Sequence, residues 1–231
     1  MTARVLVAAA LLFVSRASLV AQVGTVPANS PFRDLEKRQD VTLLVGPSFG
    51  GRDKAGAAPR GGVAIGVRYD VPLGGSPLSF TSAIMRQGST RDILQPGLPP
   101  ASRIGGTVSQ PLYMLDAALS LRVAGNKSWR SLVPIITGGV GMVTDFKEVT
   151  DSSRFGTRFS PLVGFGLKFA PQRSRWTVRA DMTNRLYSVP YPASFRDSTP
   201  NVPRVVGVNT KNSWTRNTML TLGLVRQFGR R

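Results

Sequence analysis

Eight short segments with a two-residue alternation limit the fold of this chain more than any other feature. In each of them large apolar side chains fall on one face and small or ionised side chains on the other, which indicates β-strands. Between 176 and 187, for example, Trp176 and Val178 lie opposite Arg179. The sequence therefore predicts an all-β fold from eight strands, at Val41–Gly50, Gly62–Leu73, Leu78–Gln87, Leu112–Ala124, Leu132–Thr144, Ser160–Ala170, Trp176–Tyr187 and Ser213–Phe228.

The connections between these segments alternate in length. Short links at 74–77, 125–131 and 171–175 follow the second, fourth and sixth segments, and longer links follow the others, up to those at 88–109 and 188–211. Short turns at one end and long loops at the other are typical of outer-membrane barrels, in which the short turns are periplasmic. The loop pattern therefore favours an up-and-down antiparallel barrel.

The polarity of the two faces suggests which one is turned outward. Eight strands enclose only enough room for side chains, so large apolar residues from every strand would be crowded inside. Glycine, alanine, serine and a few ion pairs would fit. We expect the apolar face to meet lipid and the sheet to close, because each unpaired backbone group in hydrocarbon costs several kcal/mol. The predicted fold is an eight-stranded antiparallel up-and-down transmembrane β-barrel over residues 41–228.

The last segment resembles the closing strand of bacterial outer-membrane barrels. Leu220, Leu222 and Leu224 share a face with the terminal aromatic Phe228, whereas Arg226 stands where that family usually has an apolar residue. Three residues also follow the aromatic where such chains normally stop. Over about 41–228 the chain resembles the small barrels of the OmpA/OmpX type, which include envelope stabilisers, adhesins and small channels. The resemblance implies a location in the outer membrane of a Gram-negative cell envelope without choosing a function.

Residues 1–21 have the features of a secretory signal peptide, with Arg4 ahead of the apolar run at 5–14. The alternative is an uncleaved anchor helix, but the run is shorter than the ~20 apolar residues that cross a bilayer. We expect residues 22–40 to be a flexible leader and 229–231 a C-terminal tail.

The composition excludes several kinds of chemistry. The chain has no cysteine and no histidine, which excludes disulfides, a Ser-His-acid triad and histidine metal sites. The enzymes among small outer-membrane barrels mostly rely on a catalytic histidine, so their mechanisms do not transfer. The remaining enzymatic alternative is an acid/base pair of Asp116 and Asp181, which we expect instead to be counter-ions in a basic lumen. The sequence therefore predicts no catalysis, no cofactor and no metal.

The net charge is +18, from 30 basic and 12 acidic residues. The basic residues are scattered singly, which argues against a nucleic-acid partner. Anionic lipid headgroups and lipopolysaccharide phosphates are better candidates. The long loops could hold a surface ligand, because recognition in such folds lies in loops.

Two sets of residues are the candidate functional residues. Ionised residues on the small face are expected to form a charge network in the lumen, either a plug of ion pairs or the lining of a gated pore for a small anion. Aromatic residues near the segment ends are expected at the membrane interfaces, unless they pack in a soluble core. The expected network is Arg68, Asp70, Asp116, Arg122, Lys168, Arg179, Asp181 and Arg185. The expected interface aromatics are Tyr113, Trp129, Phe169, Trp176, Tyr187, Trp214 and Phe228.

Some residues fit the pattern poorly. Pro47 lies inside the first segment and cannot donate to a ladder. Gly138, Gly139 and Gly141 weaken the fifth segment unless they mark a bulge or a close approach of interior side chains. Arg226 would face lipid near one interface, at a cost of ~0–1 kcal/mol if it reaches the headgroups.

The leading hypothesis is a non-enzymatic outer-membrane barrel with a structural or surface-interaction role. The second is a small porin-like channel with a basic lumen, and the third is a soluble periplasmic carrier of the lipocalin kind.

Overall fold

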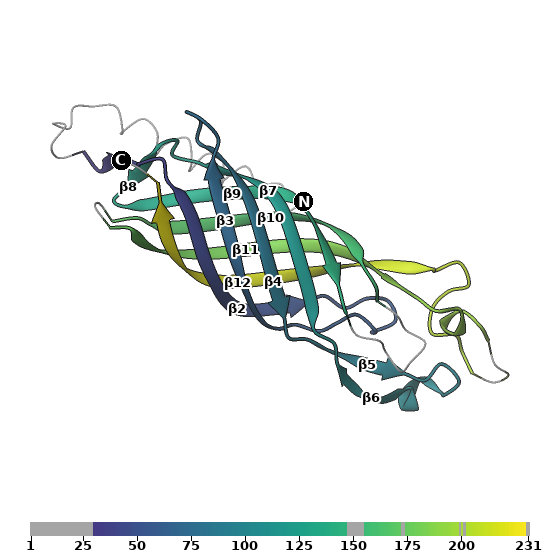
Figure 1. The fold of residues 1–231 in the computed structure, drawn as a ribbon. Helices are drawn as coiled ribbons and strands as arrows, with labels where there is room; N and C mark the ends of the chain where they lie inside the picture. Colours follow the sequence, from purple (N-terminus) through teal and green to yellow (C-terminus); the bar gives the residue numbers. More distant parts are fainter. Residues whose placement is uncertain (1–29, 147–154, 172–173, 199, 201, 230–231) are drawn as a thin grey trace, which may run out of the picture.

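Each predicted segment forms a strand in the computed structural model, which describes residues 30–146, 155–171, 174–198, 200 and 202–229 (Figure 1). Each of the eight strands pairs antiparallel with the next one in the chain, and the last pairs with the first, so the sheet closes. The predicted closed eight-stranded antiparallel barrel is thereby confirmed. Its strands are β2 (Gln39–Gly50), β3 (Gly62–Pro72), β4 (Leu78–Gln87), β7 (Leu112–Arg122), β9 (Leu132–Thr144), β10 (Arg158–Phe169), β11 (Trp176–Pro190) and β12 (Asn212–Phe228).

The strands are strongly staggered around the barrel. Following the paired residues once around, from Asp40 in β2 through the seven other strands, leads back to β2 at Gly50, ten residues further along. With strands ~4.7 Å apart and a rise of ~3.3 Å per residue, this stagger tilts the strands by roughly 40° from the barrel axis. A barrel of this size has an interior that side chains can fill.

The two ends of the barrel differ. The three short links meet at one end, the short-turn end, where β2 begins and β12 finishes. The other end, the long-loop end, carries the hairpin of β5 (Thr90–Leu94) and β6 (Ile104–Ser109), and the 3₁₀ turns η2 (Pro100–Ser102) and η3 (Ala193–Phe195). Figure 1 shows this hairpin extending beyond the barrel.

Part of the expected flexible leader is ordered against the short-turn end. β1 (Phe32–Asp34) pairs with β8 (Lys127–Trp129), and the Leu35 N–H donates to the Asn126 carbonyl at 2.8 Å. β2 also begins at Gln39, two residues before the predicted start. We call residues 30–38 the N-terminal strap. The expected signal peptide, residues 22–29 of the leader and residues 230–231 of the tail lie outside the described residues.

The residues that fitted poorly are accommodated in the strands. Pro47 lies within β2 opposite Val63 of β3, and its side chain is on the outer surface. β9 keeps an unbroken register with both neighbours, so its glycines mark no bulge. A Cβ atom at Gly141 would overlap the Asp116 carboxylate. The close-approach interpretation therefore holds for Gly141, which faces the interior.

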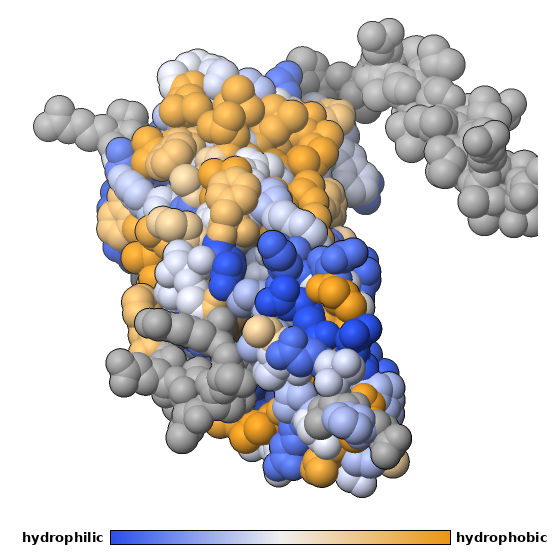
Figure 2. Space-filling view, turned by 90° about the vertical axis from the view of Figure 1, so that its right-hand side faces the viewer, coloured by the Kyte–Doolittle hydropathy of each residue, from blue (hydrophilic) through white to orange (hydrophobic). Residues whose placement is uncertain are grey.

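The outer wall is apolar and the interior is polar. Leu119, Phe165 and Val178 are 50%, 49% and 52% exposed, whereas Asp116 and Arg179 are only 7% and 2% exposed. Figure 2 shows apolar residues gathered over one part of the surface and hydrophilic residues beside them. The predicted sidedness of the strands is thus present in the structure.

Among the described residues, no α-helix is long and apolar enough to span a bilayer.

Candidate functional site

The middle of the barrel holds a ring of four buried charges. Arg68 and Asp70 lie two residues apart on β3, and Arg179 and Asp181 do so on β11, so that all four side chains point inward. The Arg68 Nε donates to both carboxylate oxygens of Asp70 at 3.1 Å. The Arg179 Nε donates to Asp181 Oδ2 at 2.6 Å, and its Nη1 reaches Asp70 Oδ2 at 3.3 Å. The signs alternate around the ring, which compensates for the burial of the ions.

Hydroxyl groups on three neighbouring strands complete this ring. The Arg68 Nη2 donates to Ser120 Oγ at 2.8 Å, and Thr81 Oγ1 donates to Asp70 Oδ1 at 2.5 Å. The hydroxyls of Ser120 and Thr137 lie 2.9 Å apart. Sequence reasoning missed these partners because they are uncharged, although they occupy inward-facing positions of β4, β7 and β9. They satisfy donors and acceptors that the charges leave unpaired.

A second ion pair crosses the interior between Arg185 on β11 and Asp116 on β7. Both terminal nitrogens of Arg185 donate to the two carboxylate oxygens at 2.7 Å, which is the strong bidentate arrangement. Arg185 is 0% exposed. Glycines leave room for the interior carboxylates, since a Cβ at Gly141 would overlap Asp116 and one at Gly166 would overlap Asp181.

Towards the long-loop end the interior becomes apolar. Buried methionines on three strands belong to a cluster that continues into the loops, where Phe155 packs edge-on against Tyr187 with ring centroids 5.5 Å apart. We call the loop part of this cluster the cap. Its described members are Ala57, Ala58, Phe155, Tyr191, Phe195 and Val206.

A hydrogen bond between two long connections helps to hold the cap. The Tyr191 hydroxyl donates to Asp53 Oδ2 at 2.6 Å, and Asp53 Oδ1 accepts the Ala58 N–H at 2.8 Å. Burial, reinforced by the bond to Asp53, raises the pKa of Tyr191 to about 12. The neutral phenol is therefore the form that the cap favours.

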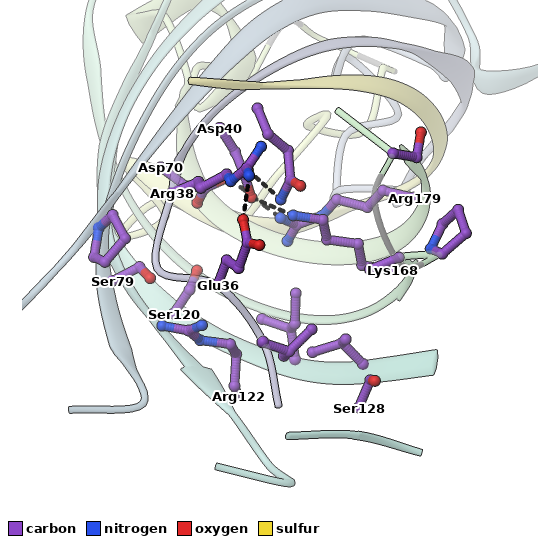
Figure 3. A pocket seen from close by; sticks show the side chains of 18 of the residues that line it. Glu36, Arg38, Asp40, Asp70, Ser79, Ser120, Arg122, Ser128, Lys168 and Arg179 are labelled. Atoms are coloured by element: carbon purple, nitrogen blue, oxygen red, sulfur yellow. Dashed lines mark hydrogen bonds and ion pairs between the residues drawn. The ribbon is translucent and has the colours of Figure 1, made fainter. Parts of the chain in front are cut away.

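A cavity of about 260 Å³ lies inside the short-turn end (Figure 3). Lys168 Nζ donates to Asp40 Oδ2 at 2.5 Å at its edge, and Gln227 Nε2 donates to Asp40 Oδ1 at 3.1 Å. The N-terminal strap contributes Glu36 and Arg38, which form an ion pair. Asp40 was missed as an interior residue because the sequence placed it in the leader.

The structure places all eight predicted network residues inside the barrel. Seven of them have ion-pair partners within 4.0 Å, which join β3 to β11, β7 to β11 and β10 to β2. Arg122 differs, because its Nε makes one long hydrogen bond to the Pro77 carbonyl at 3.4 Å and no ion pair joins it to the described residues.

Tyr187 was wrongly assigned to the interface aromatics. It is 0% exposed and lies inside against Phe155, since it shares the inward face of β11 with Arg185 rather than the outward face of Trp176. Tyr113 is half-buried on the outer side and contacts Phe146, with ring centroids 5.0 Å apart. The other five are on the outer surface: Trp129, Phe169, Trp176, Trp214 and Phe228.

Arg226 is on the outer wall and stacks on aromatic rings. Its guanidinium carbon lies 4.7 Å from the Trp176 ring centroid and 6.0 Å from that of Phe228. This contact gives the charge a partner at the short-turn rim.

The arrangement bears on two of the alternatives. Asp116 is bound by Arg185 and Asp181 by Arg179, which is the counter-ion role expected for both carboxylates. A lipocalin-like carrier would need an apolar cavity inside and a polar wall outside, and this barrel has the opposite polarity.

Side chains fill the interior between the cavity and the cap. The void beside Arg185 and Met219 is only about 30 Å³, far smaller than the cavity at the short-turn end. Within the described ranges, no cluster of three or more acidic, histidine or cysteine side chains could hold a metal ion.

No protein-family model and no curated protein matches this sequence. Among solved structures, the chain is similar to Neisserial surface protein A, with a TM-score of 0.50 and 15% identity over 82% of this chain and 97% of that chain. The fold is that of the small outer-membrane barrels. The chain also matches the N-terminal β-barrel domain of Pseudomonas aeruginosa OprF, with a TM-score of 0.41 and 13% identity over 84% of this chain and 99% of that chain. The resemblance inferred from the sequence is confirmed at the level of the fold.

Proposed function

We propose that the chain is an integral protein of the bacterial outer membrane with a structural or surface-interaction role and no catalysis. The sidedness of the closed barrel carries this proposal. Its outer wall exposes large apolar side chains on every strand while its ions face each other inside. Soluble monomers rarely expose apolar patches above a few hundred Å². Lipid is the environment in which this wall is stable, and closure leaves no strand edge unpaired.

The proposed location gives the barrel an orientation. Short turns face the periplasm in such barrels, so the cavity would lie on the periplasmic side and the cap outside the cell. Export through the secretory pathway would deliver the chain there. Arg86 and Arg216 are exposed outward-facing residues near the long-loop end, where Phe49 and Trp214 are also exposed. Their charges suit the phosphates of lipopolysaccharide, the proposed lipid partner.

The cap supports the surface-interaction part of the proposal. Its loops are held together by a buried apolar cluster, and the Arg103 Nη2 donates to the Pro203 carbonyl at 2.7 Å across two of them. A packed cap presents a defined surface, and Leu98, Ile104 and Val208 are exposed on the long connections at the same end of the barrel. A ligand of the cell surface would bind there.

Membrane extraction combined with heat-modifiability on a detergent gel tests the proposal. The protein should stay in the membrane pellet after carbonate treatment and should change mobility on boiling, as closed barrels do. Leu119→Arg places a charge on the outer wall and should lower the fraction of protein that inserts. The barrel should be destabilised in the membrane by ~2–4 kcal/mol if the site lies near the bilayer midplane. Ile104→Arg on the β6 hairpin is the matched control and should insert normally. Release by carbonate without a mobility shift would overturn the proposal.

The small-channel alternative is tested by conductance in a planar bilayer. We expect no conductance steps, because the interior between the cavity and the cap is filled by side chains that include Arg185 and Met219. Steps with anion selectivity would favour the channel instead.

A further inference from the structure

The cavity at the short-turn end is built differently from the ion pairs above it. It is enclosed by the ends of all eight barrel strands and by the N-terminal strap, and it has a volume of about 260 Å³. Arg122, Lys168 and Arg179 lie around it in Figure 3. The exposed residues Asp34 and Glu36 also line it, so the cavity reaches the surface at the rim.

The interior acids of this cavity already have cationic partners. Asp40 accepts from Lys168 at 2.5 Å and from Gln227 at 3.1 Å. Asp70 accepts from Arg179 at 3.3 Å as well as from its own neighbours in the ring. Glu36 is paired with Arg38 of the strap. These carboxylates therefore leave the remaining donors of the cavity unmatched.

The unmatched groups are all guanidinium nitrogens. The Arg122 Nη2 and the Arg179 Nη2 are buried and have no hydrogen-bond partner, and the same holds for the Arg38 Nε. Arg179 itself is 2% exposed. A buried donor without an acceptor is destabilising, and more so when it is charged. The cavity thus holds three positively charged donors without an acceptor, while the cations and carboxylates that line it are equal in number, four of each.

We propose that this cavity binds a small oxoanion, with the Arg122 guanidinium as its main contact. Phosphate and sulfate supply several acceptor oxygens and no strong donors, which is the complement of the unmatched nitrogens. Arg122 is the suitable anchor because, among the described residues, no carboxylate lies within the 4.0 Å of an ion pair with it, although Asp40 and Asp70 act on it from further away. The Ser79 hydroxyl lines the same cavity and adds a neutral donor. The volume is below the ~300–1,000 Å³ of pockets that hold drug-sized molecules, so the ligand is small.

The position of the cavity favours a free ion over a lipid headgroup. Continuous pairing of β7 with β9, of β9 with β10 and of β10 with β11 forms a wall between the cavity and the outer surface. An anion would enter at the rim, past the strap. This site is separate from the proposed role of the outer wall and of the cap.

Calorimetric titration with inorganic phosphate tests the site on the full chain refolded in a non-ionic maltoside detergent at constant ionic strength. We expect saturable binding of one phosphate per chain. Arg122→Gln should weaken binding roughly tenfold to a hundredfold, the loss of one charge-assisted contact. Arg122→Lys should retain part of the affinity because it keeps the charge. Arg175→Gln, an exposed residue at the same rim that does not line the cavity, should bind as the unaltered protein does.

Two outcomes would overturn the proposal: no saturable binding to the unaltered protein, or equal affinity in the Arg122→Gln variant. A mobility shift on boiling confirms that each variant has formed the barrel. If Arg122→Gln does not fold, Ser79→Leu gives the same test by filling the cavity with an apolar side chain, and it should abolish binding. Titration in vesicles with and without phosphatidylglycerol distinguishes the two sources of the anion. Unchanged phosphate affinity supports a free ion, and competition by the anionic lipid overturns it.

Discussion

The middle of the barrel and the cap fill their space by different physical means. In the middle, Arg68, Asp70, Arg179 and Asp181 pair with one another and with hydroxyl groups, through bonds along β3 and β11 and through bonds between strands. The cap is held by apolar side chains from loops, such as Phe155 and others that contact it. The middle therefore depends on complete charge pairing, whereas the cap depends mainly on buried apolar area.

Mutations should therefore destabilise the two regions in different ways. Loss of one member of a buried ion pair leaves an uncompensated charge, so damage in the middle is abrupt and raises the free energy of the whole barrel. Loss of an apolar side chain in the cap costs only the transfer free energy of the removed atoms and the energy of the cavity that they leave. The strands below remain paired. Mutations in the two regions should separate global from local stability.

The largest effect is expected from Asp116→Ala. It leaves the guanidinium of Arg185, which is 0% exposed, without its bidentate partner. The free energy of unfolding should fall by about 3–5 kcal/mol, because a buried charge without a partner is strongly destabilising. Urea-induced unfolding in lipid vesicles, followed by tryptophan fluorescence, measures the change.

The matched control for this prediction removes both charges. Asp116→Leu combined with Arg185→Met should be clearly more stable than Asp116→Ala alone, since replacing a buried pair by apolar groups is often nearly neutral. If the double variant were as unstable as the single one, the pairing would not explain the middle of the barrel.

The middle of the barrel was predictable from the sequence because strand alternation alone assigns side chains to a face. The two-residue alternation of one segment placed Arg179 and Asp181 inside. The same alternation places Tyr187 on the inward face of its strand. It was nevertheless assigned to the interface because it is aromatic and lies near a strand end. Asp40 was missed for another reason. Where a strand begins in a polar stretch, no apolar residues alternate with the polar ones, so the sequence does not show where the strand starts.

The cap and the ordered strap could not be derived from periodicity. Phe155, Tyr191 and Phe195 meet because the barrel brings two loops together, and loops have no repeat that relates sequence position to direction. The pairing of β1 with β8 likewise joins residues about 95 positions apart in the chain. Such contacts follow from the closed barrel, and only the barrel itself was encoded in the alternation.

Gly141→Ala tests how closely the side chains pack in the middle of the barrel. The new methyl group would overlap the Asp116 carboxylate and disturb its pairing with Arg185, so the unfolding free energy should fall by about 1–3 kcal/mol. Gly138→Ala on the same strand is the control, because a Cβ there meets no atom within 4 Å. Urea unfolding of both variants gives the comparison, and equal loss in the two would show that the interior is loosely packed.

The polar contact of the cap is tested by titrating Tyr191. Its pKa is raised from 10.0 to about 12, so its contribution to the stability of the cap is complete below pH ~10 and is lost as the pH rises through about 12. The ultraviolet absorbance of tyrosinate should show this late titration step in the unaltered protein. Tyr191→Phe should remove it and leave the steps of the other tyrosines in place. A step of Tyr191 near pH 10 would mean that the cap is open to water and that the Asp53 bond is absent.

The smallest effect is expected from Arg226→Ala, which completes the contrast between charges inside and outside the wall. Among the described residues, Arg185 has Asp116 as its only ion-pair partner, whereas Arg226 lies at the rim, within reach of water and 4.7 Å from the Trp176 ring centroid. Removing it should cost only ~0.5–1 kcal/mol, the usual range of an exposed cation–π contact. Trp176→Leu removes the same contact from the other side, so the double variant should be destabilised by less than the sum of the two single variants if the contact is real. Full additivity of the two unfolding free energies would show that Arg226 and Trp176 do not interact, and a loss as large as that of Asp116→Ala would mean that the rim is as dry as the interior.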